Sequence, residues 1–376
     1  MLNPNCLVKL IFLMITILVT NCCSVKNANV ITNKDSPFFE FKIKDRMDYY
    51  QVPSISIVVI SDSAIECTMA FGRNVNQHTL FQAASVSKTI NALGILTLVH
   101  QGRVNLDKDV NGYLKRWKLK HNKNYKEADR ITLRNILSHS AGLNVWGFPG
   151  YKVNEKLPSL IDVLNGNAER SNTEPVEVIY KPGEKFHYSG GGTTISQLVL
   201  EDVTGEDYAA YMDKNVLRAL DMKESTFQQP LSRGLQDKAT PGHDINGRVI
   251  KGKWHIYPEK GAAGLWTTPT DLGNFLIAMF EIYEGKRNYP IDKNTQYEMF
   301  KQIKNSQAGL GVFLAGELHD FSFSHDGQNE GFISRMVGYP NLKKGFVIMI
   351  NKDSAFDFMD EVTKAITSHY NMPDFE

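Results

Sequence analysis

The residues best suited to chemistry in this chain are Ser85 and Lys88, within the stretch Phe81-Gln-Ala-Ala-Ser-Val-Ser-Lys-Thr-Ile. Apolar residues recur after the serine at helical spacing (86, 90, 93, 96 and 99), and Gly102 is typical of a helix end. Residues three apart share a helix face, so the Lys88 amine can lie against the Ser85 hydroxyl. A serine needs such a base to attack a carbonyl, and a lysine acts as one only when its pKa is depressed.

The same pattern has a purely structural alternative, because a serine that precedes an apolar periodic run is often only a helix N-cap. This is the only Ser-x-x-Lys in the chain, and further polar residues follow that would complete a site. Tyr188 could bring a phenolic oxygen to the serine, although a half-buried core tyrosine would look the same. His325, at the end of a predicted strand, could donate a hydrogen bond to a substrate carbonyl or carboxylate.

Several other chemistries are excluded by their missing motifs. The glycines at 190–192 lack the Gly-x-x-x-x-Gly-Lys-Ser/Thr pattern of a phosphate-binding loop, and Ser189 does not lie in Gly-x-Ser-x-Gly. His-Glu-x-x-His is absent and the ten histidines are scattered, so no metal and no cofactor is expected.

Strand patterns at both ends of the chain must position these residues. Residues 54–60 and 64–71 predict a hairpin, and residues 310–315, 321–325, 333–339 and 345–350 predict further strands. Helices are expected over 37–51, 131–137, 194–203, from Thr268 onward, and over 356–370. The simplest packing is an α+β fold of the α/β-sandwich type. One antiparallel sheet joins the two ends of the chain, helices flank it, and a mostly helical lobe is inserted.

The N-terminal residues have a different composition. Residues 10–19 are apolar except Thr16, a length that suits a secretory signal, and Cys22 and Cys23 follow directly. This predicts a lipoprotein-type signal over 1–22, lipidation of Cys22 or Cys23, a polar tether over 23–36 and a catalytic domain over 37–376. Simple secretion and a retained anchor are the alternatives. We therefore expect a lipid-anchored protein of the bacterial cell envelope.

The remaining composition is that of an ordinary globular protein. The 376 residues carry 42 Lys and Arg against 41 Asp and Glu, so the net charge of +1 gives no reason to expect a nucleic-acid partner. Four cysteines, three of them in or beside the signal (Cys6, Cys22 and Cys23), imply no disulfide framework.

Ser85-x-x-Lys88, Tyr188-Ser-Gly and His325-Asp-Gly327, in that order, resemble the serine β-lactamase and penicillin-binding-protein superfamily. The likeness is greatest to the branch with class C β-lactamases, DD-peptidases, D-aminopeptidases and related esterases, and covers about residues 37–370. Three further stretches support it: residues 131–143, 182–189 and 261–272.

The resemblance implies a reaction and roles. Ser85 would form an acyl-enzyme, Lys88 and Tyr188 would share the proton transfers, and the N–H groups of Ser85 and Gln328 would hold the oxyanion. His325, Gly327, Gln328 and Gly190 would line the substrate site.

Two positions depart from the family pattern. Gly190 replaces the Asn of Tyr-x-Asn, and His325 replaces the Lys of Lys-Thr-Gly, which should weaken the grip on a β-lactam carboxylate. The sequence thus favours a DD-peptidase, a D-amino-acid peptidase or an esterase, acting on a small molecule or peptide. A class C-like β-lactamase and a non-catalytic binding protein remain the alternatives.

Overall fold

The computed structural model describes residues 43–126, 129–303 and 306–375 of the chain. The expected signal and tether, with Cys22 and Cys23, lie outside the described residues, as does the first part of the helix expected over 37–51. Within the described ranges no helix has both the length and the apolar character to cross a membrane.

A six-stranded antiparallel sheet forms the centre of the molecule, with the strand order β2-β1-β10-β9-β8-β7. Its strands are β1 (Ser54–Ser61), β2 (Ala64–Gly72), β7 (Phe313–Ala315), β8 (Ser322–Asn329), β9 (Phe332–Tyr339) and β10 (Lys344–Ile350). The N-terminal hairpin joins the C-terminal strands where β1 pairs with β10, from Ile55 opposite Ile350 to Ile60 opposite Gly345. The fold class expected from the sequence is therefore confirmed.

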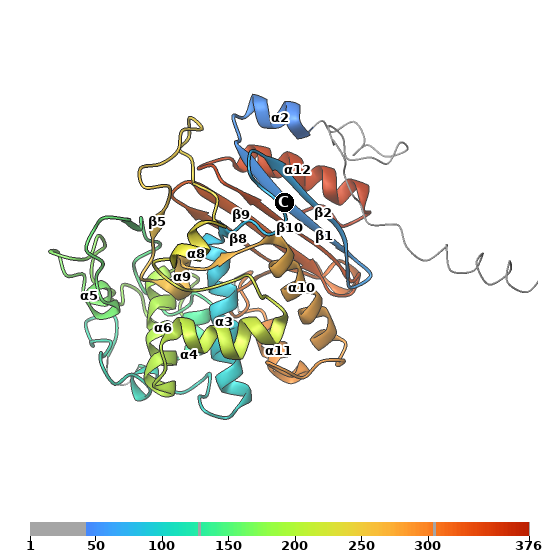
Figure 1. Ribbon diagram of the computed structural model, residues 1–376. Helices are drawn as coiled ribbons and strands as arrows, with labels where there is room; N and C mark the ends of the chain where they lie inside the picture. The colour runs from blue at the N-terminus through green and yellow to red at the C-terminus, as the bar shows by residue number, and fades with distance from the viewer. Residues whose placement is uncertain (1–42, 127–128, 304–305, 376) are drawn as a thin grey trace, which may run out of the picture.

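Helices cover both faces of the sheet, and the apolar run of β1 explains why. Ile55, Ile57 and Val59 belong to the core on one face, whereas Val58 and Ile60 belong to the core on the other. A strand buried on both faces has a continuous rather than an alternating apolar pattern. The covering helices are α2 (Ile43–Tyr49) and α12 (Phe356–His369) on the first face and α10 (Pro269–Tyr283) on the second (Figure 1).

The segment between the hairpin and the C-terminal strands forms the helical lobe beside α10 (Figure 1). Its helices are α3 (Ser87–His100), α4 (Leu133–Leu137), α5 (Leu160–Leu164), α6 (Gly190–Thr204), α7 (Tyr208–Met212), α8 (Arg233–Gln236), α9 (Lys260–Ala263) and α11 (Lys293–Met299). Two short ladders join its loops: β3 (Phe81–Gln82) with β6 (Trp266–Thr267), and β4 (Tyr151–Lys152) with β5 (His255–Ile256). The lobe and the α10 side of the sheet share one apolar core.

Two boundaries differ from the sequence expectation in ways that affect the site. Helix α6 begins at Gly190 rather than at 194, because the Ser189 side chain accepts from the Gly192 N–H and caps the glycine run. Strand β8 continues to Asn329, so His325 lies inside the strand rather than at its end. Glycine runs have weak helix propensity, which hid the first boundary.

The close approach of α10 to β1 gives a prediction about stability. A Cβ atom on Gly273 would lie 2.8 Å from Cγ1 of Val58, a stiff β-branched residue in a buried strand. We expect Gly273→Ala to lower the free energy of unfolding by about 1–3 kcal/mol, despite the better helix propensity of alanine.

The matched control is Gly234→Ala in α8, where an added Cβ meets nothing within 4 Å. That substitution should stabilise the protein by about 0.5–1 kcal/mol. Urea unfolding curves of both variants measure the difference, and an equal stabilisation by both would show that α10 does not pack this tightly.

Candidate active site

Ser85 and Lys88 meet as the sequence spacing predicts. Ser85 lies in a 3₁₀ turn (Ala84–Val86) that leads directly into α3, and Lys88 lies in the first turn of that helix. The Lys88 Nζ atom is 2.9 Å from Ser85 Oγ and donates to the carbonyl of Ala262 at 2.8 Å. Ala84, just before the serine, has a φ of +49°, which is a strained conformation of the kind found at functional sites.

Burial decides the charge of Lys88. Its side chain is only 3% exposed, and desolvation lowers its pKa from 10.5 to about 7. No carboxylate among the described residues contacts the amine to restore the charge. A neutral amine with its lone pair free can accept the hydroxyl proton of Ser85, which an ammonium cannot do.

Tyr188 lies against this pair. Its ring centroid is 5.1 Å from Lys88 Nζ, and the Ser85 hydroxyl hydrogen-bonds its phenolic oxygen. Burial raises the pKa of Tyr188 well above its usual value of 10, and the bond from Ser85 opposes this only in part. The phenol therefore stays protonated near neutral pH, where it can donate a hydrogen bond and relay a proton.

His325 reaches the same place from β8, with its ring 6.3 Å from that of Tyr188. Its Nδ1 is 2.6 Å from the carbonyl oxygen of Asp326, which can only accept, so the proton lies on Nδ1. Burial, with Lys88 nearby, lowers the pKa of the ring to about 3 and keeps it neutral. The buried Nε2 has no partner in the described structure and is an acceptor. The donor role expected of His325 is thus corrected, because its neighbouring carbonyl takes the proton-bearing nitrogen.

Gly327 and Gln328 lie where the backbone can approach Ser85. A Cβ on Gly327 would lie 2.4 Å from the carbonyl oxygen of Ala83, so only glycine fits there. Gln328 is opposite Ile333, one pair before the two-residue turn that joins β8 to β9. The pair flanking such a turn is hydrogen-bonded and the next pair is not, so the Gln328 N–H points away from β9 and out of the sheet edge.

Gly190 was expected in the substrate site, but its position in the structure gives it a supporting role rather than a binding role. It is buried under the loop of residues 146–148, where an added Cβ would meet the Phe148 ring at 3.0 Å, and its N–H donates to the Trp146 carbonyl. The position supports the pocket wall, and its missing side chain leaves room for Phe148.

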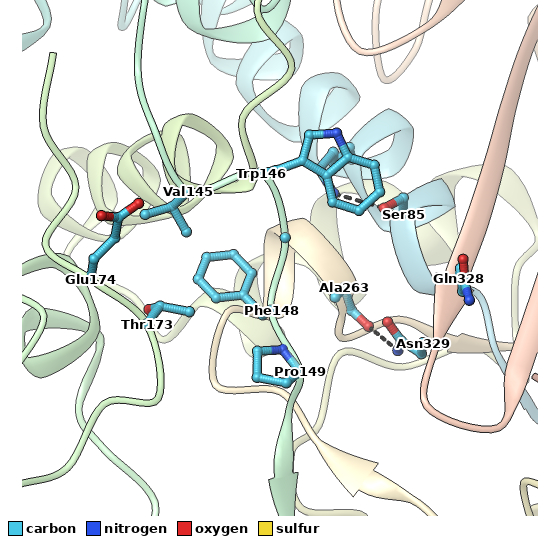
Figure 2. Close-up of a pocket in the computed structure, with 12 residues that line it drawn as sticks. Ser85, Val145, Trp146, Phe148, Pro149, Thr173, Glu174, Ala263, Gln328 and Asn329 are labelled. Carbon is cyan, nitrogen blue, oxygen red and sulfur yellow. Dashed lines mark hydrogen bonds between the residues drawn. The ribbon is translucent and has the colours of Figure 1, made fainter. Parts of the chain in front are cut away.

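A pocket of about 530 Å³ opens in front of Ser85 (Figure 2). Besides Ser85 and Lys88, it is lined by residues 145–149 and by Thr173, Glu174, Ala263, Gln328 and Asn329. Asn329 is fixed by bonds to Gln82 and to the Ala263 carbonyl. No group of three or more His, Cys, Asp or Glu residues in the described ranges is arranged to hold a metal ion.

His139 is a site residue that the sequence reasoning did not single out. It lies in a Ser-His-Ser-Ala-Gly turn, and its ring packs against that of Tyr188, with centroids 4.3 Å apart and the ring planes tilted by 32°. Its Nδ1 accepts the Ser189 N–H at 3.1 Å. A single histidine beside a turn carries no distinguishing pattern, so only the tertiary contact shows its place in the site.

A serine next to a buried lysine, at the start of a helix that lies against an antiparallel sheet, defines the serine hydrolases of the β-lactamase and penicillin-binding-protein fold. The chain belongs to the beta-lactamase family, whose sequence model matches residues 39–370. The family recognised from the Ser85, Tyr188 and His325 motifs is confirmed.

Individual relatives are distant. The chain is 22% identical to "Protein flp" of Staphylococcus aureus (strain MRSA252) over 362 residues, which cover 90% of this chain and 68% of that protein. It is 31% identical to "Esterase EstB" of Burkholderia gladioli, over only 46% of this chain and 44% of the esterase.

Solved structures show the same fold. The octameric penicillin-binding protein homologue from Pyrococcus abyssi superposes with a TM-score of 0.68 at 21% identity, covering 88% of this chain and 76% of that chain. The protein SurE superposes with a TM-score of 0.67 at 19% identity, covering 89% and 76%.

The lowered pKa of Lys88 predicts how the reactivity of Ser85 depends on pH. If the neutral amine is the base, labelling of Ser85 by a fluorophosphonate should rise with pH, with a midpoint at about 7. Below that midpoint the rate should fall about tenfold per pH unit, because the lone pair is lost on protonation. Labelling rates read by mass spectrometry give the profile.

Lys88→Met, which keeps the length of the side chain but removes the amine, should abolish labelling while the circular dichroism spectrum stays native. A midpoint near 10, or labelling retained by the variant, would exclude Lys88 as the base.

Proposed function

We propose that this protein is a serine hydrolase that cleaves small esters or amides through an acyl-enzyme on Ser85. The observation that carries the proposal is the 2.9 Å contact between Ser85 Oγ and the amine of a lysine whose pKa burial lowers to about 7. Such a pair supplies a nucleophile and its base at neutral pH.

In the proposed acylation step, Lys88 takes the Ser85 proton while Oγ forms a bond to the substrate carbonyl carbon. The N–H groups of Ser85 and Gln328 stabilise the oxyanion that develops. When the tetrahedral intermediate collapses, the bond to the leaving group breaks. Tyr188 donates its proton to that group and regains one from the Lys88 ammonium.

Deacylation repeats the sequence with water in place of the serine. Water attacks the acyl carbonyl carbon as Lys88 accepts one of its protons. The bond between that carbon and Ser85 Oγ then breaks, Tyr188 donates its proton to Oγ, and the Lys88 ammonium returns a proton to Tyr188. The enzyme returns to its starting state, and the proposed cycle consumes only substrate and water.

The pocket favours acyl donors without a carboxylate beside the scissile bond. Among the residues that line the pocket, the only basic side chain is Lys88, which serves as the catalytic base. The nearby His325 is neutral because burial lowers its pKa. A carboxylate would be desolvated there without a cation to pair with, which is unfavourable. Esters or D-amino-acid amides fit this pocket better than carboxylate-bearing β-lactams, and the partial likeness to an esterase agrees with that choice.

We also propose that this hydrolase works at the bacterial cell envelope, attached through a lipid on Cys22 or Cys23. Support for this comes from the apolar run that precedes the two cysteines. Peptidoglycan-derived D-amino-acid amides or esters that lack a carboxylate beside the scissile bond would then be within reach of the pocket.

The function is tested by stopped-flow kinetics with nitrophenyl acetate. We expect a burst of nitrophenol equal to the enzyme concentration, an acetyl group on Ser85 by mass spectrometry, and loss of both in Ser85→Ala. Benzylpenicillin should acylate Ser85 more slowly and turn over poorly.

Ser87→Ala is the control, because the Ser87 hydroxyl accepts the Leu265 N–H and does not contact the reacting atoms; its burst should remain. The absence of any Ser85 adduct with both reagents would favour a non-catalytic protein, and rapid penicillin turnover would favour a β-lactamase.

A further inference from the structure

The pocket in front of Ser85 has few ionisable side chains among its lining residues. Of its lining residues only Lys88 and Glu174 are ionisable, and the lowered pKa of about 7 leaves the buried lysine largely neutral by about pH 8. The Glu174 carboxylate makes no hydrogen bond or ion pair with any other described residue. The pocket is therefore negative, with one unpaired carboxylate at its wall.

An exposed aromatic side chain accompanies this charge. Trp146 is 69% exposed, yet its loop is fixed, because the first turn of α6 donates from Gly190 to the Trp146 carbonyl and from Gly191 to the Val145 carbonyl. The indole also contacts the Tyr188 ring, with centroids 5.3 Å apart. The indole therefore forms an aromatic wall of the pocket on the side of Ser85 (Figure 2).

Glu174 lies on the side of the pocket away from Ser85, with Phe148 between them in this view (Figure 2). An acyl group bound to Ser85 would thus extend across the pocket toward the carboxylate. At the far end of a pocket with aromatic walls, an unpaired carboxylate with no basic residue beside it suits an organic ammonium.

We propose that the pocket selects acyl groups that carry an ammonium at their far end, with Glu174 as the counter-ion and Phe148 beside the path that leads to it (Figure 2). The inference rests on the proposed acyl-enzyme function and names its substrate class. Glu174 is exposed, so the attraction is screened by salt and should weaken as ionic strength rises.

Three nitrophenyl esters of matched length test the selection. One carries a terminal trimethylammonium on a butyryl chain, the second has tert-butyl in place of trimethylammonium, and the third is the hemi-glutarate. At about pH 8, the cationic ester should have a kcat/KM about three- to tenfold above the neutral isostere, and the anionic ester should be the poorest.

Glu174→Gln should bring the cation-to-neutral ratio close to one. The matched control is Glu169→Gln, which removes an equal exposed charge outside the pocket and should keep the wild-type ratio. A ratio near one in the wild type, or a ratio unchanged by Glu174→Gln, would overturn the subsite. Failure of all three esters to react would instead refute the acyl-enzyme function.

A second inference comes from His139, on independent observations. The residues on either side of Tyr188 both hydrogen-bond to His139. The His187 N–H donates to the His139 carbonyl at 2.7 Å, and the Ser189 N–H donates to His139 Nδ1 at 3.1 Å. The His139 ring packs against the Tyr188 ring, and the His139 φ of +56° is uncommon for a residue other than glycine.

We infer that His139 is a positioning residue that aims the Tyr188 phenol at the leaving group. Because Nδ1 accepts a backbone N–H, the ring must be neutral with its proton on Nε2. Burial, with repulsion from Lys88 and from His325 and His187, holds its pKa well below 6.5 and preserves that acceptor.

The test compares His139→Leu and His139→Asn with two leaving groups. Loss of an aimed proton donor should slow an alkyl ester by at least about tenfold, but a nitrophenyl ester much less, because nitrophenolate leaves without protonation. Asparagine offers an oxygen near the place of Nδ1 and should recover part of the rate.

A double-mutant cycle with Tyr188→Phe separates positioning from general loss of structure. In the Tyr188→Phe background, His139→Leu should have little further effect on either ester, with native thermal unfolding as the folding control. Additive effects, or equal losses for both leaving groups, would overturn the positioning role.

Discussion

Desolvation of Lys88 is the physical constraint on which the rest of the site depends. A lysine in water is an ammonium at neutral pH and has no lone pair to offer. Placed in the core with one carbonyl and one hydroxyl as its polar contacts, it becomes a base with a pKa of about 7. Any carboxylate brought close to it would restore the charge, and the described residues around the amine supply only neutral groups.

The fold meets this requirement by assembling the site from segments far apart in the chain. The 3₁₀ turn before α3 supplies the serine, and the first turn of α3 supplies the lysine. The loop before α6 supplies Tyr188, α9 supplies the Ala262 carbonyl, and β8 supplies His325 and the open sheet edge. The pairing of β1 with β10 joins the two ends of the chain in one sheet. The helical lobe, which lies between these ends in the sequence, is therefore held against the open edge of β8. Neutrality extends to His325 and His139, since both rings are buried near Lys88 and neither gains a carboxylate partner.

Because His325 is neutral, its role differs from the one expected from the sequence. From the sequence it replaces a lysine of the family pattern and suggests a weaker cationic grip. In the structure it is an acceptor, since its other nitrogen is committed to the Asp326 carbonyl. The pocket thus combines a backbone suited to an oxyanion with walls that carry negative and aromatic groups, which is the basis for the substrate class proposed above.

The sheet and the helical lobe could be predicted from the sequence because they depend on local periodicity. The Ser85–Lys88 pair followed from a spacing of three residues, and the family followed from the order of the motifs. The Thr268-Pro-Thr-Asp start of α10 was equally readable, since capping involves only neighbouring residues. Four features could be seen only in the folded chain: the burial that lowers the pKa of Lys88, the tautomer of His325, the packing of His139 against Tyr188, and the pocket walls with Trp146 and Glu174. Each of these comes from contacts between distant segments, and neither the low dielectric around a side chain nor the partner of a ring nitrogen is encoded in local sequence spacing.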